Sequence, residues 1–165
     1  LFRSRSSRER MIGVILAAGM AKRLRPLTDA CPKCLLKIGE RTLLQRTVDA
    51  MIAAGINELV VVTGYRAEMI REFLTKQYPS LNIHFIHNAD YEHNNNIFSL
   101  WMTRPYTEGK DFLLSDSDIL FDPQLIRAVL ATEGNALALN RHERGEEEIK
   151  VIVDDENRIM ELSKT

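Results

Sequence analysis

Short apolar runs alternate with segments of helical period along most of this chain, and this alternation constrains the fold more than any other feature. Runs typical of buried strands lie at 11–16, 59–63, 82–87, 112–114 and 136–139, and helical periods lie at 42–54, 67–78, 97–102 and 123–130. Such an order predicts an α/β protein, namely a three-layer α/β/α sandwich with a mostly parallel (mixed) sheet. Residues 150–153 and 159–162 flank a polar turn and predict a hairpin.

The loop after the first expected strand combines small residues with concentrated positive charge. The strand runs into Leu16, Ala17, Ala18 and Gly19, where backbone N–H groups can approach a ligand closely. Four Lys and Arg side chains follow between positions 22 and 33. This combination suits a polyphosphate.

The spacing of this loop excludes two common phosphate-binding motifs. A dinucleotide fingerprint requires G-x-G-x-x-G, but Ala21 and Leu24 stand where its second and third glycines would be. A Walker loop requires G-x-x-x-x-G-K followed by Ser or Thr, and the chain contains no such run.

Two acidic residues follow the expected strand at 112–114. Asp116 and Asp118 form a D-x-D pair, and carboxylate oxygens at a strand end suit Mg²⁺, which completes its shell with water and ligand phosphates. The cationic loop and this acidic pair both follow strands, so we expect them to meet in one crevice at the carboxyl edge of the sheet.

The segment from Leu16 to Lys33 resembles the signature of the nucleotidyltransferases, L-A-A-G-x-G-x-R-L-x-P-L-T followed by P-K. The resemblance implies a Rossmann-like fold of the nucleotide-diphospho-sugar transferase type. One position departs from the signature, because Ala21 replaces the second glycine. A Cβ disfavours positive φ, so the loop either uses an ordinary φ at Ala21 or is slightly strained there.

The resemblance implies a reaction and roles for several residues. In this family a substrate phosphate attacks the α-phosphorus of a nucleoside triphosphate and releases pyrophosphate. Arg23 and Lys33 match the cations that neutralise the developing charge, and the backbone of Leu16, Ala17, Ala18 and Gly19 matches the part that holds the nucleotide. Asp118 matches the Mg²⁺ ligand, while Asp116 is either a further ligand or a capping residue. The attacking oxygen is already anionic, so alignment and charge neutralisation suffice.

A second segment narrows the resemblance. Residues 95–100, Asn-Asn-Ile-Phe-Ser-Leu, are similar to the N-N-x-x-S-L stretch of bacterial-type choline-phosphate cytidylyltransferases, and residues 62–65 match their V-x-G-Y. The resemblance implies CTP as the nucleotide and a small phosphorylated alcohol such as phosphocholine as the acceptor. It places Gly64, Tyr65, Asn95, Asn96 and Ser99 at the nucleotide, although an ordinary helix cap would also explain the asparagines.

Lys164 resembles the strand-end lysine that approaches the substrate phosphate, although a terminal lysine is also typical of a solvated surface. Tyr65 and Trp101 could form a box for a quaternary ammonium group. The helical spacing of Trp101 from Ile97 and Phe98 instead predicts a core position.

Cys31 and Cys34 form a C-x-x-C. A metal site would need further ligands, and His84 and His87 would point to opposite faces of a strand. We therefore expect both cysteines to be packing residues, with one alternative, a disulfide that displaces Lys33 and slows the reaction.

Composition limits the remaining possibilities. The 165 residues hold 22 Lys and Arg against 23 Asp and Glu, so no basic field favours a nucleic-acid partner. The sequence shows neither an apolar run long enough for a membrane span nor a signal-peptide pattern, which favours a cytoplasmic protein. A homodimer is left open.

We interpret residues 1–10 as a disordered basic leader or linker, and residues 11–165 as a nucleotidyltransferase domain that is incomplete at its C-terminus. Two alternatives to a cytidylyltransferase stay open. One is a sugar-1-phosphate nucleotidyltransferase that uses UTP or dTTP, and the other is a nucleotide-sensing domain without turnover.

Overall fold

The computed structural model describes residues 11–139 and 150–163. The chain divides into two compact units at Thr132 and Glu133, and each is described separately. Lys164, expected to approach the acceptor phosphate, lies outside the described residues. Within the described ranges, no helix has the length and apolar character needed to cross a membrane.

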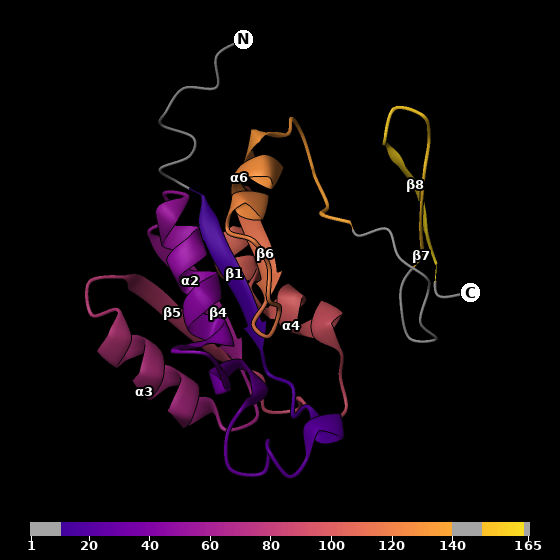
Figure 1. Cartoon of the computed structure of the whole chain (residues 1–165). Coiled ribbons are helices and arrows are strands. Elements are labelled where there is room, and N and C mark those ends of the chain that lie inside the picture. The colour runs from indigo at the N-terminus through magenta and orange to yellow at the C-terminus, as the bar shows by residue number, and fades with distance from the viewer. Residues whose placement is uncertain (1–10, 140–149, 164–165) are drawn as a thin grey trace. The chain divides into compact units, whose positions relative to one another are not determined.

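A four-stranded parallel sheet forms the centre of the first unit (Figure 1). Its strands are β1 (Ile12–Ala17), β4 (Glu58–Thr63), β5 (Asn82–His87) and β6 (Phe112–Asp116), in the order β5-β4-β1-β6. Leu16 of β1 pairs with Asp116 of β6, and Ala17 pairs with Thr63 of β4. The strands' carboxyl ends therefore lie side by side at one edge of the sheet.

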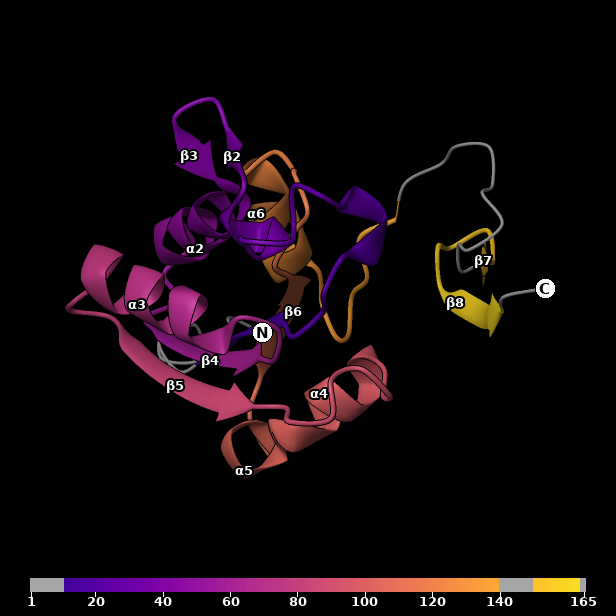
Figure 2. The same cartoon turned by 90° about the horizontal axis from the view of Figure 1, so that it is seen from below.

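Helices cover both faces of this sheet, as the view from below shows (Figure 2). One layer contains α2 (Leu43–Ala53), α3 (Ala67–Gln77) and α6 (Gln124–Ala131), and the other contains α4 (Asn96–Met102) and α5 (Arg104–Thr107). The three-layer α/β/α architecture that the alternation predicted is confirmed.

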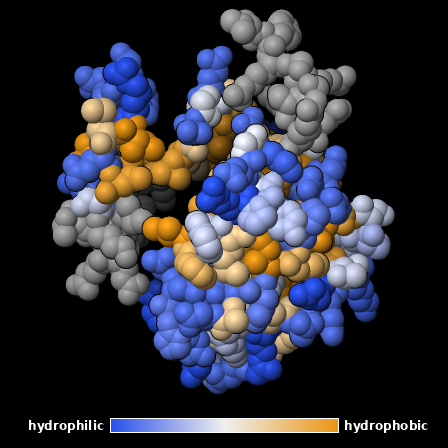
Figure 3. All heavy atoms as spheres, turned by 180° about the vertical axis from the view of Figure 1, so that it is seen from behind, coloured by the Kyte–Doolittle hydropathy of each residue, from blue (hydrophilic) through white to orange (hydrophobic). Residues whose placement is uncertain are grey.

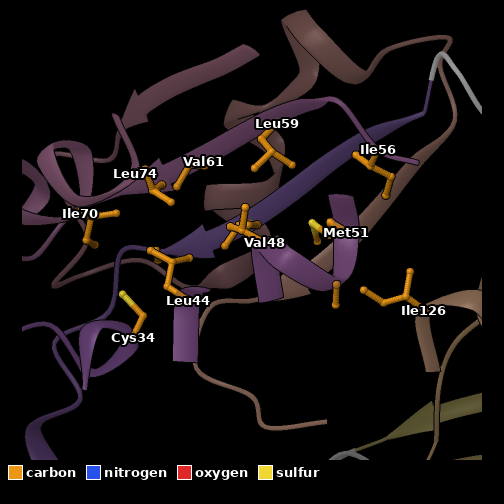
Figure 4. Close-up of a cluster of buried hydrophobic side chains, with 13 residues drawn as sticks. Cys34, Leu44, Val48, Met51, Ile56, Leu59, Val61, Ile70, Leu74 and Ile126 are labelled. Atoms are coloured by element: carbon orange, nitrogen blue, oxygen red, sulfur yellow. The ribbon is translucent and has the colours of Figure 1, made fainter. Parts of the chain in front are cut away.

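Successive side chains of a strand point to opposite faces of the sheet, so the core consists of two clusters, one against each helical layer. Ile15 and Val61 belong to the cluster that packs against α2 and α3, drawn in Figure 4. Val14 and Val62 belong to the opposite cluster, against which Leu100 of α4 packs. Side chains on both faces of β1 are buried, which explains why its sequence is a continuous apolar run rather than an alternating one.

The helices begin and end at ordinary capping signals. Thr42 caps α2 by accepting a hydrogen bond from the Gln45 N–H at 3.0 Å, and Gly55 follows this helix with a φ of 91°. Asn95 caps α4 by accepting from the Phe98 N–H at 3.2 Å. The segment between β1 and α2 contains two short 3-10 helices, η1 (Lys22–Leu24) and η2 (Lys33–Leu35), and a small hairpin of β2 (Lys37–Ile38) and β3 (Arg41–Thr42).

The second unit contains the expected hairpin, formed by β7 (Lys150–Val153) and β8 (Ile159–Ser163) in antiparallel pairing. The strand expected at 136–139 is wrong, because these residues form no strand. Leu137 and Leu139 are 54% and 49% exposed. A short apolar run becomes a strand only where a neighbouring strand satisfies its backbone, and no described strand pairs with this one.

Trp101 does not occupy the core position that its helical spacing predicted. Its side chain is 61% exposed and stacks on Phe98, with ring centroids 5.6 Å apart. Together with Ile97 these residues form the outer side of α4, and the face of the molecule away from α2 and α3 shows hydrophobic side chains at its surface (Figure 3). Of the residues of α4, Ser99 is buried and Leu100 and Met102 are partly buried, whereas Ile97, Phe98 and Trp101 face outward.

Candidate active site

A cavity of about 510 Å³ opens at the carboxyl ends of β1 and β6. It is lined by the end of β1 and the loop that follows it, by the η2 turn, by the start of α4 and by the end of β6. These residues are Leu16, Ala17, Ala18, Gly19, Ala21, Arg23, Leu24, Lys33, Cys34, Asn96, Asp116, Ser117 and Asp118. The cationic loop and the acidic pair thus share one cavity, as their places after strands predicted.

An ion pair in the cavity connects the cationic loop to the acidic pair. Lys33 Nζ lies 2.7 Å from Asp118 Oδ2, and both side chains are about one third exposed. Asn96 donates a hydrogen bond of 3.3 Å from its amide to Asp116 Oδ1. The start of α4 and the end of β6 are therefore linked directly at the acidic pair.

The environment of Asp116 disfavours its charge. Burial raises the pKa of the Asp116 carboxyl above its ordinary value, the Asp118 carboxylate raises it further, and Lys33 opposes both effects. Asp116 and Asp118 therefore lie close enough for their charges to interact, and a bound cation would favour the ionised form of both carboxyls.

The donor set fits a magnesium ion that also binds a ligand. Among the described residues, no group of three His, Cys, Asp or Glu side chains could enclose a metal ion. Mg²⁺ in phosphoryl-transfer sites takes one or two carboxylates and fills its remaining positions with water and phosphate oxygens. Asp116 and Asp118, with their hard oxygen donors, match that partial set.

The loop accepts Ala21 at the glycine position by adopting the strained conformation. Ala21 has φ 48° and ψ 49°, in the left-handed region. The hydroxyl of Thr28, a buried side chain, donates to the Ala21 carbonyl at 3.1 Å. Of the two outcomes expected for this substitution, the structure shows the strained one.

Two of the expected nucleotide-binding side chains serve local structure instead of lining the cavity. Asn95 is the cap of α4. Ser99 is buried and accepts a 3.0 Å hydrogen bond from Asn88, whose side chain also exchanges two hydrogen bonds with Asn94. This amide pair closes the turn between β5 and α4, and Asn96, at the start of α4, lines the cavity.

Gly64 and Tyr65 also lie outside the cavity lining, next to its backbone. The Tyr65 N–H donates to the Ala18 carbonyl at 3.0 Å. A Cβ on Gly64 would lie 2.7 Å from that same carbonyl oxygen and 2.7 Å from Tyr91 Cβ, so only glycine allows this approach. Tyr65 pairs with Tyr91, with ring centroids 6.5 Å apart, and not with Trp101.

Both cysteines are free thiols. Cys34 is buried, and this burial raises the pKa of its thiol to about 12, so the thiolate needed for redox chemistry is disfavoured. Burial also raises the pKa of Cys31, against a smaller opposing effect of Arg66. On β5, His84 lies 3.1 Å from Glu58 and His87 ends the strand, so the two share no site.

Four lining residues escaped the sequence reasoning as site residues: Ala21, Leu24, Cys34 and Ser117. Ser117 extends the pairing of β6 with β1 by one bond, since its N–H donates to the Leu16 carbonyl at 3.1 Å. The position of Ser117 between Asp116 and Asp118 could have identified it as a lining residue, because both aspartates were expected at the cavity.

The parallel sheet, its two helical layers and a cavity at the strand ends define an α/β domain of the nucleotide-diphospho-sugar transferase fold. The chain belongs to the MobA-like NTP transferase domain family, whose sequence profile matches residues 13–158.

The chain resembles several curated proteins. It is 33% identical over 129 residues to CMP-5'-(3-aminopropyl)phosphonate synthase of Streptomyces rubellomurinus, which is 78% of this chain and 20% of that protein. It is 27% identical over 149 residues to CTP:phosphoglutamine cytidylyltransferase of Campylobacter jejuni, covering 87% and 53%. It is also 31% identical over 115 residues to UTP--glucose-1-phosphate uridylyltransferase AglF of Haloferax volcanii, covering 70% and 46%. The chain thus spans about half or less of the length of these relatives.

Among solved structures, the inositol-1-phosphate CTP transferase of T. maritima superposes with a TM-score of 0.77 at 26% sequence identity. The match covers 94% of this chain and 64% of that one.

Proposed function

We propose that this protein transfers a nucleotidyl group from CTP to a small organic phosphate or phosphonate and releases pyrophosphate. The observation that carries this proposal is the convergence of Arg23, Lys33, Asp116 and Asp118 on one cavity at the strand ends. These side chains come from segments far apart in the chain, and their charges match a triphosphate and its counterion.

The reaction needs no general base from the protein. A phosphate or phosphonate oxygen of the acceptor attacks the α-phosphorus of CTP, the new P–O bond forms, and the bond to the bridging oxygen of pyrophosphate breaks. Arg23 and Lys33 neutralise the charge that the leaving group and the equatorial oxygens acquire. Losing one such contact costs about 10²-fold or more in rate.

Asp116 and Asp118 would hold a magnesium ion at this site. When bound, Mg²⁺ neutralises and aligns phosphate oxygens of the nucleotide. Asn96 contributes by its hydrogen bond to Asp116, which fixes the direction of that carboxylate.

The choice of CTP is supported by two relatives and one solved structure whose names specify a cytidine nucleotide. Their acceptors, by name, are an aminoalkyl phosphonate, a phosphorylated glutamine and an inositol phosphate. These share a small polar body and one phosphorus group, and we extend that class, phosphocholine included, to this protein.

The test is pyrophosphate release with CTP, UTP, GTP, ATP and dTTP, each paired with phosphocholine, 2-aminoethylphosphonate, inositol-1-phosphate and glucose-1-phosphate. We expect release with CTP and one of the first three acceptors, and only with Mg²⁺ present. Absence of release with every pair would overturn the proposal. Asp118→Asn separates turnover from binding, because it should abolish release while metal-free nucleotide binding persists.

A sugar-1-phosphate nucleotidyltransferase is the second candidate. It is favoured by the uridylyltransferase relative, which is nearly as similar as the first of the cytidylyl-transferring relatives described above. Release with UTP or dTTP and glucose-1-phosphate, and none with CTP, would decide for it.

A further inference from the structure

One residue outside the cavity ties together the two ends of the loop that lines it. The backbone N–H of Tyr65 donates to the Ala18 carbonyl, where the loop leaves β1. The Tyr65 hydroxyl lies 2.9 Å from the Thr28 carbonyl oxygen and 3.0 Å from that of Asp29, where the loop turns back. The intervening residues, 19–27, include Arg23.

The Tyr65 hydroxyl has a complete set of partners. Its single proton is shared between the two carbonyl oxygens, and its own oxygen accepts from Arg66 Nε at 3.4 Å. Arg66 also donates directly to the Asp29 carbonyl at 2.6 Å. Tyr65 and Arg66, two consecutive residues of the β4–α3 loop, therefore both bind the backbone of the cationic loop at residues 28–29.

A further hydrogen bond connects residue 28 to the strained residue of the loop, Ala21. Thr28, whose carbonyl binds Tyr65, donates its hydroxyl to the carbonyl of Ala21. Ala21 holds a left-handed conformation two residues before Arg23. Such a conformation persists only where the surroundings hold it, and the hydrogen bond from the Thr28 hydroxyl to the Ala21 carbonyl is one contact that does so.

We propose that Tyr65 is a positioning residue that sets the conformation of residues 19–28 and thereby the place of Arg23 against the nucleotide phosphates. This inference rests on the proposed function for its effect on turnover. It also gives the Gly-Tyr pair of the V-x-G-Y motif a physical meaning. Gly64 allows the backbone approach to Ala18, and Tyr65 uses that approach to reach both ends of the loop.

The chain offers a matched control. The Tyr78 hydroxyl donates to Asp49 Oδ1 at 2.7 Å and lies 3.3 Å from the Gln45 carbonyl, where it joins α2 to the end of α3 away from the cavity. Tyr65→Phe and Tyr78→Phe each remove one hydrogen-bonded hydroxyl and nothing else. An effect seen in both variants reflects a general loss of stability, whereas an effect seen only in Tyr65→Phe reflects its contacts with the loop.

The first measurement is amide hydrogen exchange of the ligand-free protein. Tyr65→Phe should speed exchange in residues 19–29 by about tenfold, and Tyr78→Phe should leave this segment unchanged. Equal exchange of residues 19–29 in Tyr65→Phe and the unchanged protein would overturn the inference, whether or not the protein turns over any substrate.

The second measurement is a double-mutant cycle on turnover with Arg23→Ala. We expect Tyr65→Phe to lower kcat about 10-fold to 10²-fold with a smaller change in KM, and to have less than about a twofold effect once Arg23 is absent. Equal losses in both backgrounds, or an unchanged kcat, would overturn the inference while the proposed function stands. No pyrophosphate release by the unchanged protein would instead overturn the proposed function, and the exchange result would still decide the role of Tyr65 in the loop.

Discussion

Lys33 Nζ of the cationic loop and Asp118 Oδ2, just past the end of β6, form an ion pair at 2.7 Å. The same carboxylate is the one we assign to a magnesium ion. A magnesium ion bound as proposed would therefore compete with Lys33 for Asp118.

Replacing Lys33 should move two measurable quantities in opposite directions. Lys33→Met removes a positive charge from beside both aspartates, so Mg²⁺ affinity in the absence of nucleotide should rise about fivefold, as expected for a partly exposed ion pair. Turnover should fall by about 10²-fold because the triphosphate loses a cation. Calorimetric titration with Mg²⁺ and a pyrophosphate assay measure the two effects. Lys37→Met, at an exposed position on β2, is the control and should change neither. A weaker Mg²⁺ affinity in Lys33→Met would contradict the competition.

Asp116 should make stability depend on pH. Its pKa is raised in the folded state, first by burial and then by Asp118. The folded protein therefore keeps this proton to a higher pH than the unfolded chain, and stability falls as pH rises from about 3.9 through the raised pKa. Asp116→Asn should match the unchanged protein in acid and have the higher Tm at neutral pH.

Thermal unfolding of Asp116→Asn across pH 3 to 8 measures this effect, and Asp111→Asn, an exposed position just before β6, is the control. Asparagine keeps an oxygen to accept from Asn96, so the comparison isolates the charge. A Tm difference that is largest in acid would contradict the assigned cause.

Two glycines near the cavity should respond differently to alanine. A Cβ at Gly19 meets no atom within 4 Å, whereas a Cβ at Gly64 would lie 2.7 Å from the Ala18 carbonyl. Gly64→Ala should destabilise the fold by about 1–3 kcal/mol, as overpacking does. Gly19→Ala should leave stability within about 0.5 kcal/mol. It should nevertheless weaken nucleotide binding about tenfold, because the added methyl group enters the cavity lining.

Denaturant unfolding and nucleotide titration of both variants give the comparison. Unaltered nucleotide binding by Gly19→Ala would show that the ligand does not approach this part of the loop. The two variants serve as controls for each other, since both add one methyl group within the same region.

Restoring the second glycine of the signature should stabilise the protein. Ala21 has φ 48°, and Ala21→Gly removes a cost of roughly 1–2 kcal/mol while adding about 0.5–1 kcal/mol of unfolded-state entropy. The net gain of about 0.5–1 kcal/mol corresponds to a Tm rise of about 2 °C for a protein of this size. Ala54→Gly, at a residue with φ −87°, should lower the Tm instead. A drop in Tm for both variants would show that Ala21 is not strained.

The sequence predicted those parts of the fold whose patterns are local. The continuous apolar run of β1 and the Thr42 and Gly55 signals around α2 specify their elements within a few residues. The strand expected at 136–139 failed because its formation depends on a partner strand, which no local pattern reveals. The core position expected for Trp101 failed for a related reason, since helical spacing defines a stripe but not the side on which a sheet lies.

The same division applies to the candidate site. Arg23, Lys33 and Asp118 could be placed together because each follows a strand or belongs to a contiguous signature. The signature could not say that Tyr65 lies beside the cavity and not in it, because its contacts with Thr28 and Asp29 are made over 36 residues or more. Ser99 was likewise assigned to the nucleotide, although its hydroxyl accepts from the buried Asn88 amide.

The pairing of Leu16 with Asp116 has a consequence for how the chain tolerates insertions. Residues added in the turn between β2 and β3, which contributes no lining residue, would leave this register unchanged. A single residue inserted within β6 would instead reverse the alternation of its side chains, and the carboxylate at 116 would exchange sides with Ser115. The register of β1 against β6 is therefore a part of the fold in which a change of one residue in length would alter the cavity.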